Sequence, residues 1–357
     1  MARTIRRRDF LKAVGGAIGF AGLASVGACA PAAAPSPTAT TAPKPAPAAQ
    51  ATPQAAAPPP AKTAPLKFTL GATAVGLGGV LPVIMRDRKI TEKYNIDPDV
   101  KTFTAADASA AFLNKVLDVS FLGVVETFRV WEQGKTIQLF QPIQANHTSI
   151  VALKGAPYKH IKDLRGKKIG SLGRTSSVYQ DLMLVTKVMG LELEKDFQVV
   201  FGDNLLLEGL LQKKEIDAAT LVEPRASITI AQGVFDEVTT TRGIWQELTG
   251  EKLFTLGYGA WKDWIAKNQD AVKRIARAIE ETQNVLISEP KAYQDYAKFF
   301  GFEKPEEIAL AGKRIPDLFV PKWTPKILEN IELTAKRMVE FKLLEKMPPI
   351  GDIILQV

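Results

Sequence analysis

Two short stretches of the chain, 106–109 and 175–178, place hydroxyl and carboxyl side chains at the starts of predicted helices. The first N–H groups of a helix have no partner within it and carry a partial positive charge. Such a start can therefore hold an oxygen of a carboxylate, sulfonate, nitro or uracil-like group. Asp107, Thr175 and Ser176 are the side chains that would take part, although each could instead serve only as a helix cap.

Two aromatic residues, Phe121 and Tyr179, lie near these helix starts in the sequence. Phe121 belongs to a short apolar segment, and Tyr179 lies one turn into the helix that follows Ser176. If the two rings face each other, a flat ligand could stack between them, which contributes about 0.5 to 1.5 kcal/mol beyond area burial. The alternative is that both are ordinary core aromatics.

Further candidates stand at the ends of predicted strands or between the two halves of the chain. Thr73 ends the first predicted strand, and Glu223 ends a later one beside Pro224. Asn146 and His147 lie where the chain approaches its second half. Ligands of open α/β sheets bind beyond the carboxyl ends of the strands, so we predict ligand contacts from Thr73 and Glu223. We also predict that Asn146 supplies a hydrogen bond from the hinge side. A lone glutamate or loop histidine is otherwise a solvated surface residue.

The residue types that catalysis most often needs are scarce. Beyond residue 65 the chain has His147 and His160 but no cysteine, so neither a Cys/His pair nor a standard zinc site can be assembled. The sequence has no G-x-S-x-G, G-x-x-x-x-G-K-[ST] or H-E-x-x-H motif. The glycine-rich stretch 75–79 lacks the spacing of a dinucleotide fingerprint. We therefore predict a protein that is not an enzyme and needs no metal or cofactor.

Strand, loop and helix alternate along the body of the chain, from residue 66 onward. Period-two alternation in LKFTLGAT and similar segments predicts strands, and apolar residues at helical spacing predict the helices between them. The predicted strands are 66–73, 98–104, 119–122, 168–171, 197–203 and 217–224. The predicted helices are one that begins at Leu81, 106–117, one that ends at Trp131, 174–190, 205–216, 305–313 and 325–341. This order predicts an α/β clamshell of two lobes, each a mostly parallel sheet flanked by helices, with a helical C-terminal tail.

The first 28 residues have the order of an export signal: a basic segment and then an uncharged run, 13–28. The run is short for a permanent membrane span, which needs roughly 20 mostly apolar residues. The segment RRDFLK, which begins with Arg7 and Arg8, resembles the twin-arginine export motif. The stretch VGAC resembles a lipobox, in which Cys29 would be lipidated and become the mature N-terminus. The alternative for the basic segment is a helix that touches nucleic acid or lipid. The alternative for Cys29 is a chance cysteine in an ordinary signal peptide.

Residues 30–65 form a segment rich in Ala, Pro and Thr that has no large apolar residue to bury, which is typical of an extended spacer. The whole chain carries a net charge of +8, of which the signal contributes +4 and the spacer two lysines, so the body retains about +2. Nucleic-acid binding needs a clustered basic surface. We therefore predict no nucleic-acid partner.

The body resembles the solute-binding proteins of ABC importers, in the branch that handles nitrate, alkanesulfonates, taurine and thiamine or riboflavin precursors. The resemblance rests on LKFTLGAT, ADASAAFLNKVLDVSFLG, KHIKDLRGKKIGSLGRTSS and IDAATLVEP, and it covers nearly all of 66–357. It implies a periplasmic-binding-protein-like fold whose two lobes close on a ligand. It also implies delivery of that ligand to a permease with its ATPase.

Within this family the sequence is most similar to the riboflavin-binding lipoproteins of vitamin importers. The expected ligand is therefore riboflavin or a related flat heteroaromatic vitamin; an alkanesulfonate, taurine or nitrate is the alternative. A pyrimidine-precursor biosynthetic enzyme of the same fold is the alternative of another class. We predict lobe 1 at 66–155, lobe 2 at 156–255, and a return to lobe 1 with C-terminal helices at 256–357. A lipid anchor on Cys29 would hold the protein on the extracytoplasmic face of the cell membrane.

Overall fold

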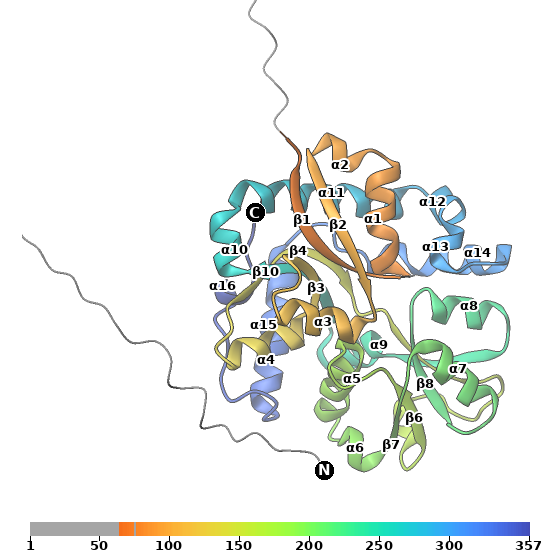
Figure 1. Ribbon diagram of the computed structural model, residues 1–357. Coiled ribbons are helices and arrows are strands. Elements are labelled where there is room, and N and C mark those ends of the chain that lie inside the picture. The colour runs from red at the N-terminus through yellow and green to blue at the C-terminus, as the bar shows by residue number, and fades with distance from the viewer. Residues whose placement is uncertain (1–63, 75) are drawn as a thin grey trace, which may run out of the picture. The chain divides into compact units, whose positions relative to one another are not determined.

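The first sheet is built around the alternating segment LKFTLGAT, which forms β1 (Leu66–Thr73) with Phe68, Leu70 and Ala72 buried. The computed structural model describes residues 64–74 and 76–357, and the strand order of this sheet is β2-β1-β3-β10-β4 (Figure 1). β1 pairs in parallel with β2 and β3, whereas β10 runs antiparallel to β3 and β4. The other strands are β2 (Ile96–Phe103), β3 (Val119–Gly123), β4 (Ile137–Ala145) and β10 (Phe254–Trp261).

The second sheet repeats this plan with the order β7-β6-β8-β5-β9. β6 pairs in parallel with β7 and β8, and β5 runs antiparallel to β8 and β9. Its strands are β5 (Thr148–Leu153), β6 (Lys168–Ser171), β7 (Gln198–Phe201), β8 (Ala218–Val222) and β9 (Phe235–Thr240). Each sheet thus has one strand that opposes the other four. The α/β fold predicted from the sequence, with two mostly parallel sheets, is confirmed.

Helices cover both sheets (Figure 1). In the first half of the chain they are α1 (Leu77–Asp87), α2 (Ile90–Lys93), α3 (Ala105–Leu113), α4 (Val124–Glu132), η1 (Ile161–Leu164), α5 (Ser177–Val188), α6 (Leu193–Asp196) and α7 (Asn204–Gln212). In the second half they are α8 (Arg225–Ala231), α9 (Thr241–Thr249), α10 (Lys262–Lys267), α11 (Gln269–Ser288), α12 (Lys291–Asp295), α13 (Ala297–Phe300), α14 (Pro305–Arg314), η2 (Pro316–Leu318), α15 (Pro325–Glu340) and α16 (Ile350–Ile353).

Several helix boundaries differ from those predicted, among them the start of α1 and the end of α3, where local backbone conformation is informative. α1 begins at Leu77, before the predicted Leu81, and Gly76 with its φ of 81° sets the limit on the N-terminal side. α3 ends at Leu113 and not at Leu117, because Lys115 takes a left-handed φ of 59°. A residue in that conformation cannot continue a right-handed helix.

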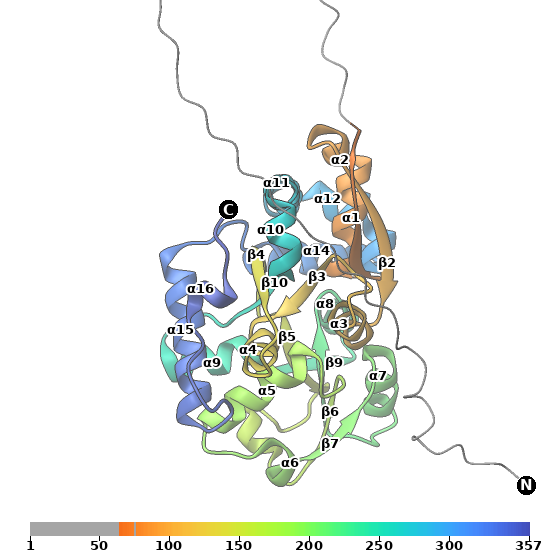
Figure 2. The ribbon, with the colours of Figure 1, turned by 60° about the vertical axis from the view of Figure 1, so that its left-hand side comes forward.

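The chain passes between the two sheets twice. It leaves β4 through Asn146 and His147 and enters β5 in the second sheet; later it returns from α9 to β10 in the first. The first passage comes before residue 155, where the sequence placed the end of lobe 1, because β5 pairs with β8 and β9. After β10 the chain is largely helical, and α15 packs against α4 and α16 (Figure 2).

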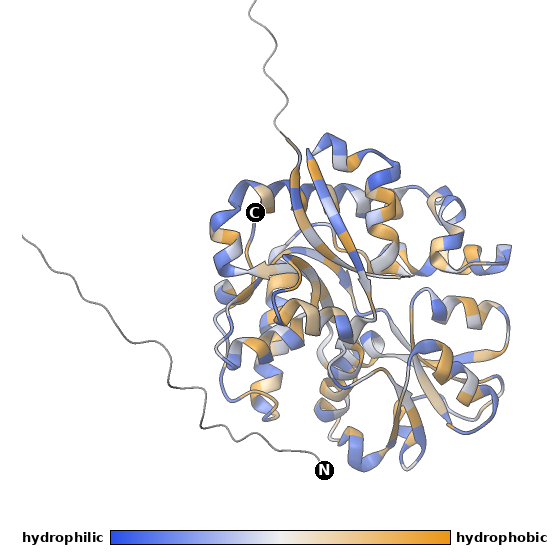
Figure 3. Ribbon diagram, viewed as in Figure 1, coloured by the Kyte–Doolittle hydropathy of each residue, from blue (hydrophilic) through white to orange (hydrophobic). Residues whose placement is uncertain are grey.

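The apolar core has three parts. One lies on the first sheet, where Val80 and Ile84 of α1 meet Ile275 and Ile279 of α11. A smaller one joins the second sheet to α7 and α8. The largest includes Phe128 of α4, Leu182 of α5, Trp245 of α9 and Met338 of α15, so it extends over helices attached to both sheets. Most helices accordingly carry both hydrophobic and hydrophilic residues (Figure 3).

The predicted export signal, Cys29 and residues 30–63 of the spacer lie outside the described residues. Within the part of the chain that is described, no helix is both long and apolar enough to cross a membrane.

Candidate functional site

The loops of the two sheets meet at two places where helices begin. A Cβ added at Gly123, which precedes α4, would lie 2.9 Å from the Cβ of Ser177 at the start of α5. A Cβ added at Gly76, which precedes α1, would lie 3.5 Å from Cδ of Pro224, which precedes α8. The starts of α4 and α5, and those of α1 and α8, therefore lie side by side. Helix starts carry partial positive charge, so this boundary favours electron-rich oxygen atoms.

Of the three polar residues predicted at helix starts, Ser176 acts as a cap. The Ser176 hydroxyl accepts a hydrogen bond from the Tyr179 N–H at 3.3 Å and donates one to the Gly173 carbonyl at 2.7 Å. Thr104 caps α3, because its Oγ1 accepts from the Asp107 N–H at 3.2 Å and donates to Asp107 Oδ2 at 2.7 Å. Ser176 is buried, whereas Asp107 and Thr175 are exposed. The cap alternative describes Ser176 well.

The two aromatic residues predicted to contact a ligand pack in different hydrophobic clusters. The Tyr179 hydroxyl donates to Glu194 Oε1 at 2.6 Å, and its ring packs against Phe201 with centroids 5.6 Å apart. Phe121 instead packs against the core of the first sheet. The stacking of a flat ligand between these two rings stays a prediction.

Asn146 forms part of a buried polar junction at the first passage between the sheets. Its side-chain amide donates to Asp181 Oδ2 at 2.9 Å, and Thr255 Oγ1 donates to the same oxygen at 2.6 Å. Asp181 is 1% exposed, and burial raises the pKa of its carboxyl to about 7. Because Asp181 belongs to α5 and Thr255 to β10, the junction joins the second-sheet helix to both passages of the chain.

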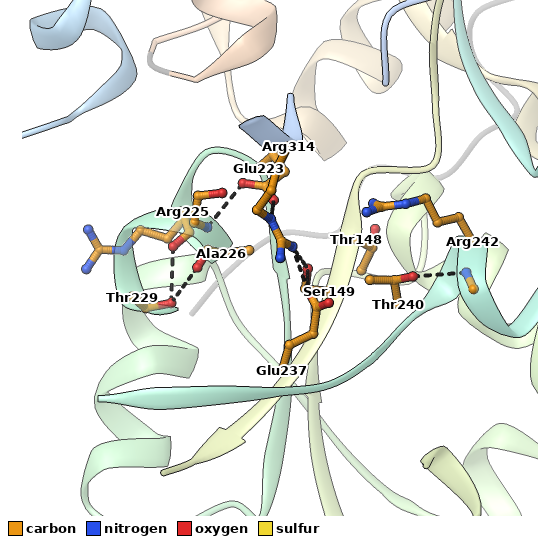
Figure 4. Close-up of polar contacts among 12 residues, drawn as sticks. Thr148, Ser149, Glu223, Arg225, Ala226, Thr229, Glu237, Thr240, Arg242 and Arg314 are labelled. Carbon is orange, nitrogen blue, oxygen red and sulfur yellow. Dashed lines mark hydrogen bonds and ion pairs between the residues drawn. The ribbon is translucent and has the colours of Figure 1, made fainter. Parts of the chain in front are cut away.

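Glu223 is buried in an ion-pair network around Arg314 (Figure 4). Its Oε1 accepts from Arg314 Nε at 2.8 Å, and its Oε2 accepts from the Ser227 N–H at 3.1 Å. Arg314 Nη2 also donates to Ser149 Oγ at 2.9 Å and to Glu237 Oε2 at 2.5 Å. Both oxygens of Glu223 thus have protein partners. Arg314, at the end of α14, contacts β5 through Ser149, β9 through Glu237 and the end of β8 through Glu223.

Glu126 lies in the first turn of α4, where the helix starts meet. Its carboxylate accepts from the Gly123 N–H at 3.3 Å and from Ser109. Burial raises the pKa of Glu126 to about 7, although both hydrogen bonds act in the opposite direction. Near neutral pH this carboxyl group can therefore donate as well as accept a hydrogen bond.

Several buried polar atoms at the edge of the second sheet that faces the first have no hydrogen-bond partner among the described residues. Each of these residues is at most 8% exposed. Two of these atoms lie where the chain enters the second sheet: His147 Nδ1, and Thr148 Oγ1 at the start of β5. The others are Ser171 Oγ at the end of β6, Ser227 Oγ in the first turn of α8, and Thr241 Oγ1 directly after β9. Buried polar atoms are almost always paired in folded proteins, so these five need partners that the described residues do not supply.

Arg242 lies in the first turn of α9, beside this edge. The structure gives its guanidinium one hydrogen bond, from Nη1 to the Asn146 carbonyl at 3.5 Å. Desolvation lowers the pKa of Arg242, and burial together with the Arg242 charge lowers the pKa of His147 to about 4. His147 is consequently a neutral imidazole at physiological pH.

Thr73 ends β1 of the first sheet. It lines a cavity of about 330 Å³ beside β1, β2 and α1, together with Pro82, Val83, Val100 and Phe299. In the described part of the chain no group of three or more His, Cys, Asp or Glu side chains is arranged to hold a metal ion.

Sequence reasoning named Asn146 and Glu223, whose ligand contacts stay predictions, and did not name Arg242, Arg314 or Glu126. One signal for Arg242 was available, because a cation in the first turn of a helix opposes the helix dipole and is therefore unusual. Arg314 gave no such signal, since its partners lie far away in the sequence.

Two mixed sheets, joined by two passages of the chain and facing each other through helix starts, define the periplasmic-binding-protein-like class of folds. The chain belongs to the NMT1/THI5-like family, whose family model matches residues 105–293. This confirms the family resemblance seen in the sequence, whereas the similarity to riboflavin-binding members stays a prediction.

The chain is similar to three proteins that illustrate the range of this family and fold. It is 27% identical over 231 residues, 64% of this chain and 69% of the relative, to a protein of Brucella abortus (strain 2308) named as a candidate binding protein. It is 23% identical over 207 residues, 54% of this chain and 58% of the relative, to 4-amino-5-hydroxymethyl-2-methylpyrimidine phosphate synthase of Schizosaccharomyces pombe. The alkanesulfonate-binding protein SsuA of Xanthomonas axonopodis pv. citri, solved with MOPS, superposes with a TM-score of 0.68 at 14% identity, covering 83% of this chain and 100% of that one.

Proposed function

We propose that this protein is the solute-binding component of an ABC importer, which captures a small solute between its two sheets and delivers it to a permease. The observation that carries the proposal is the set of unpartnered buried polar atoms at the second-sheet edge, including Thr148 Oγ1 and Ser171 Oγ. A bound solute would supply the missing hydrogen bonds. Family members named as binding proteins support the same role.

The proposed solute is a small molecule with an oxygen-rich group, such as an alkanesulfonate, taurine or nitrate. Short hydroxyl side chains, helix starts and Arg242 at this edge match acceptor oxygens. The sequence predicts that riboflavin would stack between Phe121 and Tyr179. In the structure these two residues pack in different hydrophobic clusters. Riboflavin therefore remains in the test as the competing ligand.

The proposal includes extracytoplasmic attachment to the membrane through a lipid on Cys29, after export directed by Arg7 and Arg8. Replacement of Cys29 by Ser should move the protein from the membrane fraction to the soluble fraction and leave solute affinity unchanged. Retention of Cys29→Ser in the membrane fraction would contradict the anchor.

The synthase relative keeps one alternative of another class, a pyrimidine-precursor enzyme. The two functions differ in what happens to the ligand, because an importer subunit releases it unchanged. Recovery of a chemically altered ligand after incubation, detected by mass spectrometry, would favour the enzyme.

The test is thermal unfolding of the full chain, purified in detergent, with ethanesulfonate, taurine, nitrate or riboflavin at millimolar concentration. Binding to the folded state raises the melting temperature. We expect ethanesulfonate or taurine to raise it and Ser171→Ala to reduce that rise, because the buried Ser171 Oγ has no other partner among the described residues. Ser288→Ala, at an exposed serine of α11, is the matched control. If no compound raises the melting temperature, the proposed function is wrong.

A further inference from the structure

Arg242 is held in a position that the fold alone does not favour. It lies in the first turn of α9, a helix with no acidic residue in that turn, so its charge adds to the positive end of the helix dipole. Its guanidinium has five N–H donors, yet among the described residues it makes one hydrogen bond, to the Asn146 carbonyl at 3.5 Å. Among the described residues no carboxylate lies within ion-pair distance of Arg242.

Several polar groups near Arg242 have no hydrogen-bond partner among the described residues. Thr148 points toward the Arg242 guanidinium in Figure 4, and its fully buried hydroxyl has no hydrogen-bond partner among the described residues. The same holds for Thr241 Oγ1, one residue before Arg242, and for His147 Nδ1. Thr240 Oγ1 caps α9 by accepting from the Gly243 N–H at 2.9 Å, which leaves the earlier N–H groups of the turn without intrahelical partners.

The nearby charges leave Arg242 as the open cation of this corner. Arg314, Glu223 and Glu237 all influence Arg242, but Arg314 already pairs with both glutamates. Arg242, Arg314, Glu223 and Glu237 together carry no net charge. Asp317, which also acts on Arg242, is exposed to solvent. An anionic group would therefore meet a balanced surrounding, in which direct contact with one guanidinium and one helix start outweighs more distant charges.

We propose that Arg242, together with the start of α9 and the Thr148 hydroxyl, binds the oxyanion group of the transported solute. The inference rests on the proposed function and adds to it the residue that selects the ligand. A carboxylate, sulfonate or nitrate offers the several acceptor oxygens that match the fork of an arginine side chain. The rest of the solute would extend toward Ser171 and Ser227.

Isothermal titration of the full chain with ethanesulfonate tests this assignment. Arg242→Gln should weaken ethanesulfonate binding roughly 30-fold, the usual effect of losing a charge-assisted hydrogen bond. Arg165→Gln is the matched control, because Arg165 is an exposed arginine that pairs with Asp196 at 2.8 Å. Thr148→Val removes only a hydroxyl and should weaken binding about 5-fold, and it decides the matter if Arg242→Gln does not fold.

Each outcome separates this inference from the proposed function. A folded Arg242→Gln that binds ethanesulfonate as well as the wild type overturns the inference and leaves solute binding intact. If the wild type binds riboflavin but not ethanesulfonate, the inference is likewise overturned and solute binding is left intact. If the wild type binds neither these compounds nor taurine or nitrate, the proposed function fails and the inference fails with it.

Discussion

Two arginines at the boundary between the sheets are built into the fold in opposite ways. Arg314 donates to Glu223, Glu237 and Ser149, and its guanidinium holds three segments of the second sheet together. Arg242 makes one long contact, to the Asn146 carbonyl, and is surrounded by polar atoms without partners. The first arrangement stabilises the fold, because its buried charges are paired. The second leaves interactions unmade, which is how a binding site differs from a structural contact.

The largest effect on this contrast is expected from Arg314→Gln. The side chains of Glu223 and Arg314 are 1% and 19% exposed, so the substitution leaves a buried carboxylate without its cation. We expect the free energy of unfolding, measured in urea, to fall by about 3 kcal/mol.

The control for this prediction is the double variant Arg314→Gln with Glu223→Gln. Removing the stranded charge should restore part of the lost stability. A loss below about 0.5 kcal/mol in the single variant would place Arg314 among ordinary surface ion pairs and remove the contrast with Arg242.

A smaller effect is expected from Asp181→Asn, which tests a third arrangement, a buried carboxyl without a cation. The pKa of Asp181 in the folded protein is about 7, above its ordinary value of 3.8. The folded state therefore holds the proton more tightly than the unfolded state. The contribution of this group is fully present below about pH 4 and is lost as the pH rises through about 7.

Asparagine cannot ionise but can still accept from Asn146 and Thr255. At about pH 8 we expect Asp181→Asn to be more stable than the wild type by roughly 1 to 3 kcal/mol, and at about pH 4 to be nearly equal. Urea unfolding across this range measures the difference, and Asp270→Asn, at an exposed aspartate, is the control. Equal pH profiles for wild type and Asp181→Asn would show that Asp181 stays ionised when buried.

The smallest effect on stability is expected from Arg242→Gln. Because Arg242 makes one long hydrogen bond and its charge is partly desolvated, its removal should change the free energy of unfolding by less than about 1 kcal/mol. Urea unfolding without ligand measures this value. A loss as large as that of Arg314→Gln would show that Arg242 is a structural residue, and the comparison would collapse.

Much of the fold follows from local pattern, and β10 shows what local pattern does not predict. The strands 66–73 and 168–171 have the predicted bounds, because each carries its own alternation or apolar run. β4, β5, β9 and β10 were not predicted as strands. Of these, β10 contains Gly257 and Gly259, which weaken strand propensity. Those glycines are needed by packing: added Cβ atoms would lie 3.1 Å from the Gln141 carbonyl oxygen and 2.9 Å from that of Gln138. Such a requirement exists only once β4 is in place.

The site was predicted less well than the fold for the same reason. Helix starts could be located from caps such as Ser176, but a cap and a ligand contact use the same side chains. Glu223 was identified from its position at the end of a strand, whereas its partner Arg314 lies in α14. Whether a polar side chain is satisfied depends on partners that only the folded chain brings close.

The two passages of the chain also affect the order in which the sheets can be completed during synthesis. All five strands of the second sheet come from one continuous stretch, 148–240. The first sheet is interrupted, because β10 lies between β3 and β4 and is made only after that stretch. The second sheet can therefore pair fully while the first still lacks an interior strand, so the part of the protein begun first is the part finished last.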